Sequence, residues 1–241
     1  MIDRSYSELA LEASHQWGLF TVAQAERLGV TRDRVSDLVE DGHALPTEEE
    51  NLYRFAGAPV DVMLDGLRTS LLAFTPARFL REILRALRGD PWDGAIVSHV
   101  SAACLVHELG TLTPSCLEFT VDTSPQIVTR RLDIYVRSGR PDWKLVDGLP
   151  VTTIPQTIAD LHAEHTDYGH LGDVIYDALM RSCVDFNSIA ASLEAVSGGK
   201  GRETMLHMLD VVGAPRDVVE ALELVSLRNW QHGNRPAKGQ T

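Results

Sequence analysis

The sequence is poor in cysteine and has no long hydrophobic run. Its three cysteines, Cys104, Cys116 and Cys183, are scattered and odd in number, which argues against a disulfide framework and favours a reducing compartment. The longest apolar stretches, such as residues 102–106, fall far short of the ~20 residues that span a bilayer. The N-terminus has no basic segment followed by an apolar core, so we expect no signal peptide and a cytoplasmic protein.

The motifs of several enzyme classes are also missing. The sequence contains no H-E-x-x-H zinc motif and no G-x-S-x-G nucleophile elbow. It has no G-x-x-x-x-G-K-[ST] loop either, and the glycines and lysine at 198–201 lack the spacing that phosphate binding requires. We therefore expect no catalytic activity, no cofactor and no metal ion.

Two catalytic alternatives remain open. Residues 98–99 form a Ser-His pair that, with His107, suggests a nucleophile and a base, although Ser98 is better placed as the cap of a helix. Asp133, Asp142 and Lys144 resemble part of a metal-dependent nuclease, in which acids hold Mg²⁺ and a lysine steadies the attacking water. Cleavage of DNA by the purified protein would favour the nuclease.

A group of histidines suggests a third alternative, a metal site. His162 and His165 are three residues apart and would share a helix face, with Asp160 just before them and His170 just after. Zinc requires three or four ligands that converge at ~2 Å. Histidines at the exposed end of a helix explain the same pattern without a metal.

The net charge of −12 restricts the nucleic-acid partners that the chain can have. Nonspecific binding to DNA or RNA depends on the neutralisation of phosphates by cations. An acidic chain is therefore a poor nonspecific binder, but it is compatible with a small specific interface or with a basic protein partner.

Residues 5–57 have the pattern of a compact helical unit. Leu9, Ala13 and Trp17 recur every four residues and predict one helix face. Two short helices are predicted next, over 22–28 and 32–40, each preceded by a threonine suited to cap it. Strand-like segments around residues 44–45 and 52–55 follow.

The turn between the two short helices has the pattern A-x-x-L-G-V-T, from Ala25 to Thr31. A small alanine lets the helices approach each other, and Gly29 suits the tight turn. A helix, a short helix, a glycine turn, a capped helix and a β-hairpin follow one another in the order of a winged helix-turn-helix. A generic helical hairpin is the alternative.

In a helix-turn-helix the N-terminal part of the second helix meets the base edges in the major groove. Arginine can bind guanine through two hydrogen bonds, and a helix N-terminus attracts phosphate. The recognition helix, the start of the preceding helix and the wing strand together supply the candidate DNA-binding residues. These are Thr21, Gln24, Thr31, Arg32, Arg34, Ser36 and Arg54.

The charge of this N-terminal segment argues partly against DNA. Residues 1–60 contain five arginines and eleven acidic residues, a net charge of −6. Three consecutive glutamates, at 48–50, lie in the predicted wing and would repel the phosphate backbone. Surface ion pairs with Asp33, Asp37 or Glu40 are the alternative role for the arginines of the second helix.

An apolar helix is predicted from Pro76 to about Arg88. Arginines at every third or fourth position form a basic stripe on it, at Arg78, Arg81, Arg85 and Arg88. The stripe is either a solvated helix face or a docking surface for phosphate or an acidic partner.

The rest of the chain alternates strand and helix patterns. Strands are predicted at 117–121, 131–136 and 149–153, and helices at 98–110, 155–161, 173–181, 188–196, 203–211 and 217–230. We predict an α+β protein with a winged helix-turn-helix domain over 1–58 and a larger mixed α/β domain over 59–232. The polar tail, 233–241, is expected to be disordered.

Two stretches of the larger domain carry a family resemblance. One reads V-S-H-V-S-A-A from Val97 and is followed by Leu109-Gly110, and the other reads D-G-L-P-V-T-T-I-P-Q-T-I-A-D-L from Asp147. With the predicted head before them, the chain resembles the AbiEi family of antitoxins. The resemblance covers residues 5 to 200. The sequence departs from it in the acidic wing and at Gln156, where many relatives have arginine.

The resemblance implies an antitoxin of a type IV toxin–antitoxin system that acts in phage defence. Its head would bind inverted repeats in its own promoter and repress the operon. Because a single head offers few positive contacts, we also expect dimeric or cooperative binding to the repeat. The larger domain would provide antitoxicity against a nucleotidyltransferase-like toxin, with or without direct contact. The alternative from the charge is a protein-interaction module that no longer binds DNA.

Overall fold

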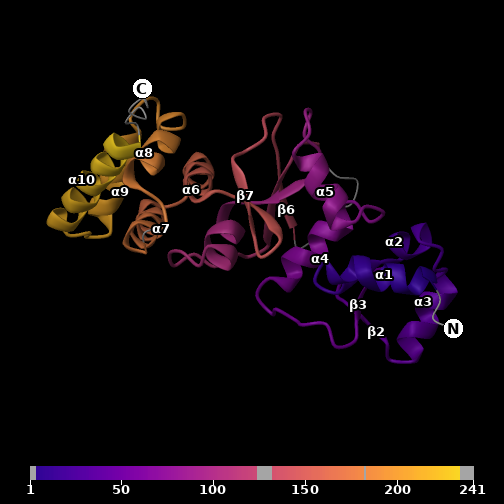
Figure 1. Ribbon diagram of the computed structural model, residues 1–241. Helices are drawn as coiled ribbons and strands as arrows, with labels where there is room; N and C mark the ends of the chain where they lie inside the picture. The colour runs from indigo at the N-terminus through magenta and orange to yellow at the C-terminus, as the bar shows by residue number, and fades with distance from the viewer. Residues whose placement is uncertain (1–3, 124–131, 182, 234–241) are drawn as a thin grey trace, which may run out of the picture. The chain divides into compact units, whose positions relative to one another are not determined.

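The chain is built of helices and short strands that form two sheets, in agreement with a mixed α/β composition of the predicted α+β class. The computed structural model describes residues 4–123, 132–181 and 183–233, and Figure 1 labels most of its elements. Two compact units are present. The first comprises Met1–Val97, Ser115–Arg140 and Lys144–Val151, and the second comprises Ser98–Pro114, Pro141–Trp143 and Thr152–Thr241.

The first unit begins with a segment that we call the head. Its elements are α1 (Arg4–Ser14), β1 (Leu19–Thr21), α2 (Val22–Arg27), α3 (Arg32–Glu40), β2 (Ala44–Pro46) and β3 (Leu52–Phe55). Strands β1 and β2 flank β3 in a three-stranded antiparallel sheet. One hydrophobic cluster joins the three helices to this sheet, and the ring of Phe55, partly buried against the cluster, lies 4.7 Å from that of Phe20 between centroids.

The predicted pair of short helices is confirmed, and its local cause is visible. Thr21 caps α2, since its Oγ1 accepts the Gln24 amide at 3.0 Å while the Gln24 side chain accepts the Thr21 amide. Gly29 takes the turn with φ of +85°, a conformation that favours glycine. Thr31 then caps α3 by accepting the Arg34 amide at 3.3 Å.

Trp17 does not share a helix face with Leu9 and Ala13, so that part of the prediction is wrong. Helix α1 ends at Ser14, and Trp17 has a φ of 61°. Its indole Nε1 donates to the Asp147 carbonyl at 2.9 Å, and the Arg68 guanidinium lies 5.3 Å from the centre of its ring. Because the helix has ended before Trp17, this side chain contacts Arg68 and Asp147 in the rest of the first unit.

The remainder of the first unit is built on a five-stranded mixed sheet. Its elements are α4 (Asp65–Phe74), α5 (Leu80–Leu87), β4 (Ala95–Val97), β5 (Leu117–Val121), β6 (Leu132–Val136), β7 (Trp143–Val146) and β8 (Leu149–Thr152). The strand order is β6-β5-β4-β8-β7, with β4 parallel to β8, β5 parallel to β6, and β4 antiparallel to β5. Phe74 of α4 meets Phe119 of β5 edge-on, with centroids 5.1 Å apart.

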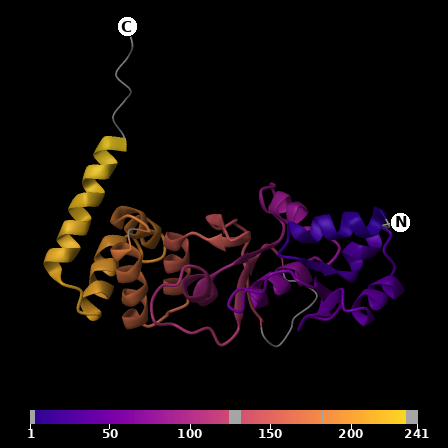
Figure 2. The same ribbon diagram turned by 60° about the horizontal axis from the view of Figure 1, so that its bottom comes forward.

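The second unit is helical. It contains a π-helical segment, η1 (Ser101–Val106), and the helices α6 (Ile154–Ala163), α7 (Tyr168–Met180), α8 (Phe186–Glu194), α9 (Gly201–Val211) and α10 (Arg216–Gly233). A single apolar cluster fills the space between them. Helices α8 and α9, orange to yellow in Figures 1 and 2, lie side by side, and α8 also packs against α6.

The helix predicted after Ser98 is present. It begins at His99 and continues as η1, the Ser98 carbonyl accepts the Ala102 amide at 3.0 Å, and the Ser98 hydroxyl lies 2.8 Å from Nδ1 of His99. The predicted tail, 233–241, lies outside the described residues from residue 234 onward. Across the described ranges, no helix combines the length and the apolar character that a bilayer crossing needs.

Candidate nucleic-acid interface

Helix α3 turns one face into the head and the other to solvent. Val35 and Leu38 are buried in the head's hydrophobic cluster, as expected for an amphipathic helix. The opposite face is exposed from the capping residue, Thr31, to the last residue of the helix, Glu40. It consists of Thr31, Arg32, Asp33, Arg34, Ser36, Asp37 and Glu40. Four of the seven predicted DNA-binding residues, Thr31, Arg32, Arg34 and Ser36, therefore lie together on an accessible surface.

The two arginines of α3 differ in their partners. Arg34 forms an ion pair with Asp37, with 3.3 Å between Nη1 and Oδ2. Arg32 instead donates from Nη1 to the amide oxygen of Asn51 at 2.8 Å. The neutral amide of Asn51 does not compensate the charge of the guanidinium. Arg32 is therefore the positively charged residue of this face that is most available to bind an anion or a hydrogen-bond acceptor.

Asn51 is held in place by its own backbone. It has a φ of 60°, and its carbonyl accepts the amide of Val22, the first residue of α2, at 2.9 Å. The end of the hairpin loop is thereby tied to the start of α2, and the Asn51 side chain is left to orient Arg32. The sequence analysis missed this residue, although an asparagine next to a strand in a loop was a usable signal for a left-handed turn.

Two hydroxyls complete the exposed face of α3. Ser36 Oγ donates to the Arg32 carbonyl at 3.2 Å, and Thr31 Oγ1 accepts the Arg34 amide. A hydroxyl has one donor and two acceptor positions, so each still has capacity for a further hydrogen bond. Thr31 can still donate to a phosphate oxygen or a base acceptor, whereas Ser36 can still accept from a donor group on a base edge, each without losing the contact it already makes.

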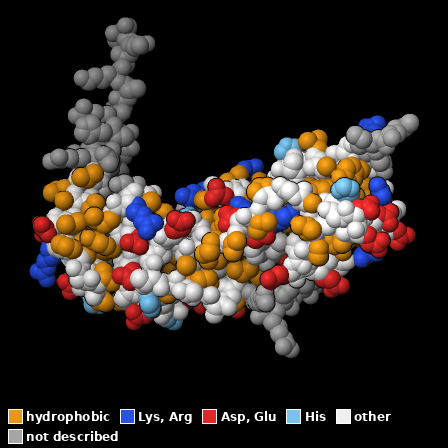
Figure 3. Space-filling view, turned by 90° about the horizontal axis from the view of Figure 1, so that it is seen from below, with side chains coloured by type: hydrophobic (Ala, Val, Ile, Leu, Met, Phe, Trp, Pro, Cys, Tyr) orange, Lys and Arg blue, Asp and Glu red, His pale blue; other side chains and the backbone are white. Residues whose placement is uncertain are grey.

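Acidic side chains surround the arginines. Asp33, Asp37 and Glu40 share the exposed face of α3, and Glu48 and Glu50 are exposed in the loop between β2 and β3. In Figure 3 red side chains gather over the end of the first unit that carries these elements. A polyanion can therefore bind α3 only through a small, specific interface, because the flanking carboxylates repel it.

Thr21 and Gln24 were predicted to contact DNA, and this is wrong because both side chains are buried. Thr21 is 3% exposed and Gln24 is 0% exposed. Thr21 Oγ1 donates to the carbonyl of Pro76, and Gln24 Nε2 donates to the carbonyl of Arg78 at 2.6 Å. Their hydrogen-bonding groups connect α2 to the segment before α5 rather than to an external ligand.

Arg54 was predicted to reach the DNA backbone from the wing strand, and this is also wrong. Its side chain is buried and binds Asp65 at the start of α4, with 2.6 Å between Nη2 and Oδ2. Nη1 also donates to the carbonyls of Trp17 and Pro59, at 3.1 Å and 2.6 Å. The guanidinium is thus satisfied inside the first unit, where it joins the head to α4.

Residues 76–82, which we call the cover segment, lie along the whole length of α2. At the far end of α2, Arg27 forms a bidentate ion pair with Glu82, at 2.7 Å and 2.9 Å, and also donates to the carbonyl of Ala77. Leu80 donates its amide to Gln16 Oε1 at 3.0 Å. The cover segment therefore follows one side of α2, through Thr21, Gln24 and Arg27, while Glu26 stays exposed.

The Arg27–Glu82 pair has a marked electrostatic effect. The hydrogen bond from Arg27 lowers the pKa of Glu82 from 4.5 to about 2, against the opposing effect of burial. The Phe79 amide, which donates to Glu82 Oε2 at 2.9 Å, contributes to the same lowering of the pKa. Glu82 thus caps α5 and anchors Arg27 at once.

The predicted basic stripe is present on and beside α5, with partners that differ along it. Arg78 pairs with Asp93 at 2.7 Å, and Arg81 pairs with Glu12 at 2.8 Å. Arg85 is exposed and makes no ion pair within the described part of the chain. Arg88 is also exposed. Among the four, Arg85 therefore offers its charge to solvent without an ion pair within the described residues.

The residues of the serine and histidine alternative are engaged in structural contacts. Ser98 and His99 are buried, with His99 at a φ of 51°, and their side chains bind each other. His107 Nε2 lies 2.8 Å from the Thr152 carbonyl. A nucleophile that is buried in this way is not accessible to a substrate.

The nuclease alternative requires residues that the sheet separates. Asp133 lies on β6 and Lys144 on β7, the two edge strands of the five-stranded sheet. Four strand spacings of ~4.8 Å place these edges about 19 Å apart. Asp133 instead accepts a hydrogen bond from the Cys116 thiol at 2.7 Å, which raises the pKa of that thiol. The two residues therefore do not share one metal site.

The histidines of the second unit do not converge. The Nδ1 of His170 is 3.1 Å from Thr111 Oγ1, while the ring of His162 lies 5.8 Å from that of Tyr168. Burial, helped by nearby His165, lowers the pKa of His162. Among the described residues, no group of three or more histidine, cysteine, aspartate or glutamate side chains is arranged to hold a metal ion.

Comparisons with known proteins show no family for this chain. No family model matches the sequence, and no curated protein matches it. Among solved structures, the chain is similar to the crystal structure of the RV2827C protein from Mycobacterium tuberculosis. The TM-score is 0.46 at 14% identity, and the alignment covers 93% of this chain and 82% of that chain.

Proposed function

We propose that the head is a winged helix-turn-helix that binds duplex DNA sequence-specifically through α3. The observation that carries the proposal is the exposed N-terminal half of α3, where Thr31, Arg32 and Ser36 lie on one accessible face. The order of elements from α1 to β3 is the order of this motif. The buried face of α3 is fixed by Val35 and Leu38, so the exposed face is presented rigidly.

Arg32 is the residue that would select a base. Its guanidinium can form two hydrogen bonds with O6 and N7 of guanine, a contact worth about 1–3 kcal/mol of discrimination. Asn51 fixes the side chain from behind at 2.8 Å, which reduces the conformational entropy that binding costs. Thr31 and Ser36 would bind the phosphates or bases beside it.

A single head offers few cations, and this argues for binding as a pair. With Arg34 paired to Asp37 and carboxylates on both sides of it, one head has little electrostatic attraction for a duplex. Two heads on an inverted repeat would double the specific contacts without adding nonspecific affinity. A footprint over a single half-site would contradict this arrangement.

We further propose that the chain is an antitoxin of the AbiEi type, which represses its own operon in the cytoplasm and counteracts a nucleotidyltransferase-like toxin. The support is the pair of sequence motifs that begin at Val97 and Asp147. The first motif begins at the last residue of β4 and the second runs through β8, and Val97 of β4 is in register with Val151 of the parallel strand β8. The two motifs therefore meet in the sheet.

The proposal is tested by measuring binding to the DNA upstream of the gene. Fluorescence anisotropy at two salt concentrations, with a scrambled duplex for comparison, separates specific from nonspecific affinity. We expect the Arg32→Ala variant to lose about tenfold or more in affinity for the specific duplex, and little for the scrambled one. The Arg216→Ala variant, on α10 of the second unit, is the matched control. Equal affinity of the wild type for both duplexes would end the proposal.

A second candidate function is that of a protein-interaction module that does not bind DNA. The exposed Glu48 and Glu50 beside α3 favour it, because an acidic surface suits a basic protein partner. Co-purification with a nucleotidyltransferase encoded next to the gene, together with no binding to the upstream duplex, would establish this candidate in place of the first.

A further inference from the structure

The cover segment occupies the position that DNA would otherwise approach. In a helix-turn-helix the helix before the recognition helix crosses the phosphate backbone. Here residues 76–82 lie against that helix at both ends, through Thr21 to Pro76 and through Arg27 to Glu82. On the side of α2 that carries Thr21 and Arg27, a duplex bound to α3 would therefore meet the cover segment and α5.

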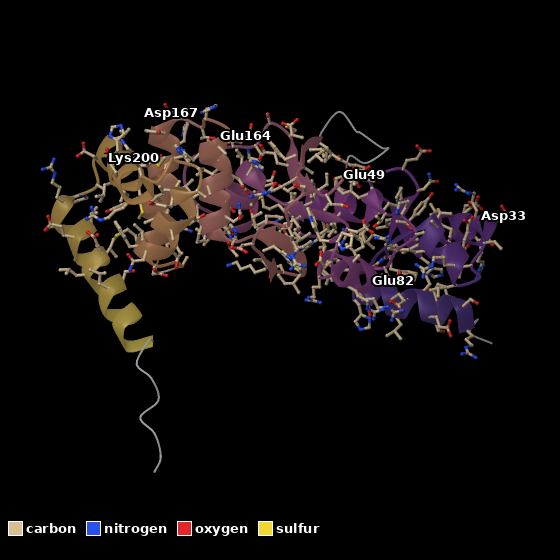
Figure 4. The ribbon with its side chains drawn as sticks, turned by 90° about the horizontal axis from the view of Figure 1, so that it is seen from above. Asp33, Glu49, Glu82, Glu164, Asp167 and Lys200 are labelled. Carbon is tan, nitrogen blue, oxygen red and sulfur yellow. The ribbon has the colours of Figure 1, made fainter. Side chains whose placement is uncertain are left out.

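The opposite flank of α3 is acidic. Figure 4 places Glu49 of the hairpin loop and Glu82 of α5 on opposite sides of the head, with Asp33 of α3 at its end. The hairpin side carries three consecutive glutamates and cannot neutralise phosphates. Positive charge for the backbone has to come from the α5 side.

The arginines of α5 supply that charge. Arg81 and Arg85 are four residues apart, so they project from the same helix face. The Arg81 side chain is 66% exposed although it pairs with Glu12, and Arg85 is exposed and unpaired within the described residues. Arg81 is also steadied by the ring of Phe79, 5.8 Å from its guanidinium carbon. Arg85 can bind an anion without breaking an ion pair within the described residues, whereas Arg81 would share its guanidinium with Glu12, whose side chain is 14% exposed.

We propose that Arg81 and Arg85 of α5 bind the phosphate backbone of duplex DNA beside the site of α3, in place of the contacts that α2 would make. The proposal rests on the proposed function, since it assigns the sequence-independent half of the same interface. It also assigns a ligand to the basic stripe, whose partner the sequence left open. DNA is favoured over an acidic protein because the stripe borders the covered face of α2.

The test uses the full chain with Arg85→Ala and Arg85→Lys variants. Arg85 has no ion pair within the described residues to lose, so its replacement leaves the fold intact. Loss of one phosphate contact should weaken binding about five- to tenfold at 0.1 M salt and make the slope of log K against log salt shallower by about 0.9. The loss should be the same for the specific and the scrambled duplex, and Arg85→Lys should restore most of it.

The outcomes separate this inference from the proposed function. If Arg32→Ala abolishes specificity while Arg85→Ala leaves both affinity and salt slope unchanged, the inference is overturned and the proposed function stands. If the wild type binds neither duplex, both are overturned. An equal effect of the control Arg216→Ala on the salt slope would show that net charge, and not the position of Arg85, is responsible, and would also overturn the inference.

Discussion

Arg54 shows how the environment of one residue decides its role. Its position on a predicted wing strand suggested a phosphate contact, but β3 is the central strand of the head's sheet. Alternate residues of a strand point to opposite faces, and Arg54 points inward, to Asp65. The positive charge that the sequence analysis assigned to DNA binding is thus paired with Asp65 inside the protein.

Replacement of Arg54 by methionine should destabilise the protein by about 3 kcal/mol, because the Asp65 carboxylate would keep its charge without its partner. Urea denaturation followed by circular dichroism measures the change in the free energy of unfolding. The double variant Arg54→Met, Asp65→Leu should recover part of the loss, since it removes the unpaired charge as well. If the single variant is as stable as the wild type, the ion pair does not join the head to α4.

The start of α5 shows the limit of a prediction that is made element by element. The apolar pattern predicted a helix from Pro76, but α5 begins at Leu80. The carbonyls of residues 76, 77 and 78 would be the first acceptors of the predicted helix, and they accept hydrogen bonds from Thr21, Arg27 and Gln24 instead. Tertiary hydrogen bonds from α2 and its cap to residues 76–78 therefore prevent this turn from joining the helix, and no local sequence pattern predicts them.

The contact between α2 and α5 should depend on pH. The pKa of Glu82 is lowered from 4.5 to about 2 in the folded protein. Its contribution to stability is therefore present above pH 4.5 and is lost as the pH falls through 2. We expect Glu82→Gln, which keeps the cap on Phe79, to be about 1 kcal/mol less stable than the wild type at pH 7, because the pair is partly exposed.

Urea titrations at pH 7 and at pH 3 measure this effect. The difference between the Glu82→Gln variant and the wild type should be smaller at the lower pH. A difference that stays constant between the two would show that Glu82 acts through its shape or its hydrogen bonds and not through its charge.

The loop between β2 and β3 should oppose DNA binding. Glu50 is exposed and next to Asn51, which contacts Arg32. Replacement of Glu50 by glutamine removes one repelled charge and should raise the affinity for the specific duplex about two- to fivefold at low salt. Glu203→Gln, an equally conservative change at an exposed position of α9, should leave the affinity unaltered. If Glu50→Gln does not raise the affinity for the duplex, the loop lies away from the bound DNA.

Several strands escaped the sequence analysis for a physical reason. Strands β1 and β4 have three residues each and β7 has four, too few for an alternating pattern to be recognised. The longer β5 and most helices were predicted close to their observed bounds, since each has a clear apolar period. For the site, the exposed residues of α3 followed from the helix pattern, while the burial of Thr21, Gln24 and Arg54 depends on residues 59–78 and could not be derived from the head alone.

At the scale of the whole molecule, the head belongs to the same compact unit as the five-stranded sheet. The predicted domain boundary at residue 58 separates Arg54 from Asp65 and α2 from the cover segment. A fragment that ends at residue 58 should therefore lack a cooperative unfolding transition when it is followed by the fluorescence of Trp17, its single tryptophan. A sharp transition, with a midpoint near that of the full chain, would show that the head is independent.

The exposed face of α3 has a consequence for how this protein can diversify. Its inner residues are committed to the core, whereas Arg32 and Ser36 touch no buried side chain through the contacts described above. In the proposed DNA-binding role, exchanges at these two positions would alter the preferred duplex at little cost in stability. Related proteins could then change their target sequence through surface substitutions alone, whereas a head moved to another protein would need residues 59–82 as well.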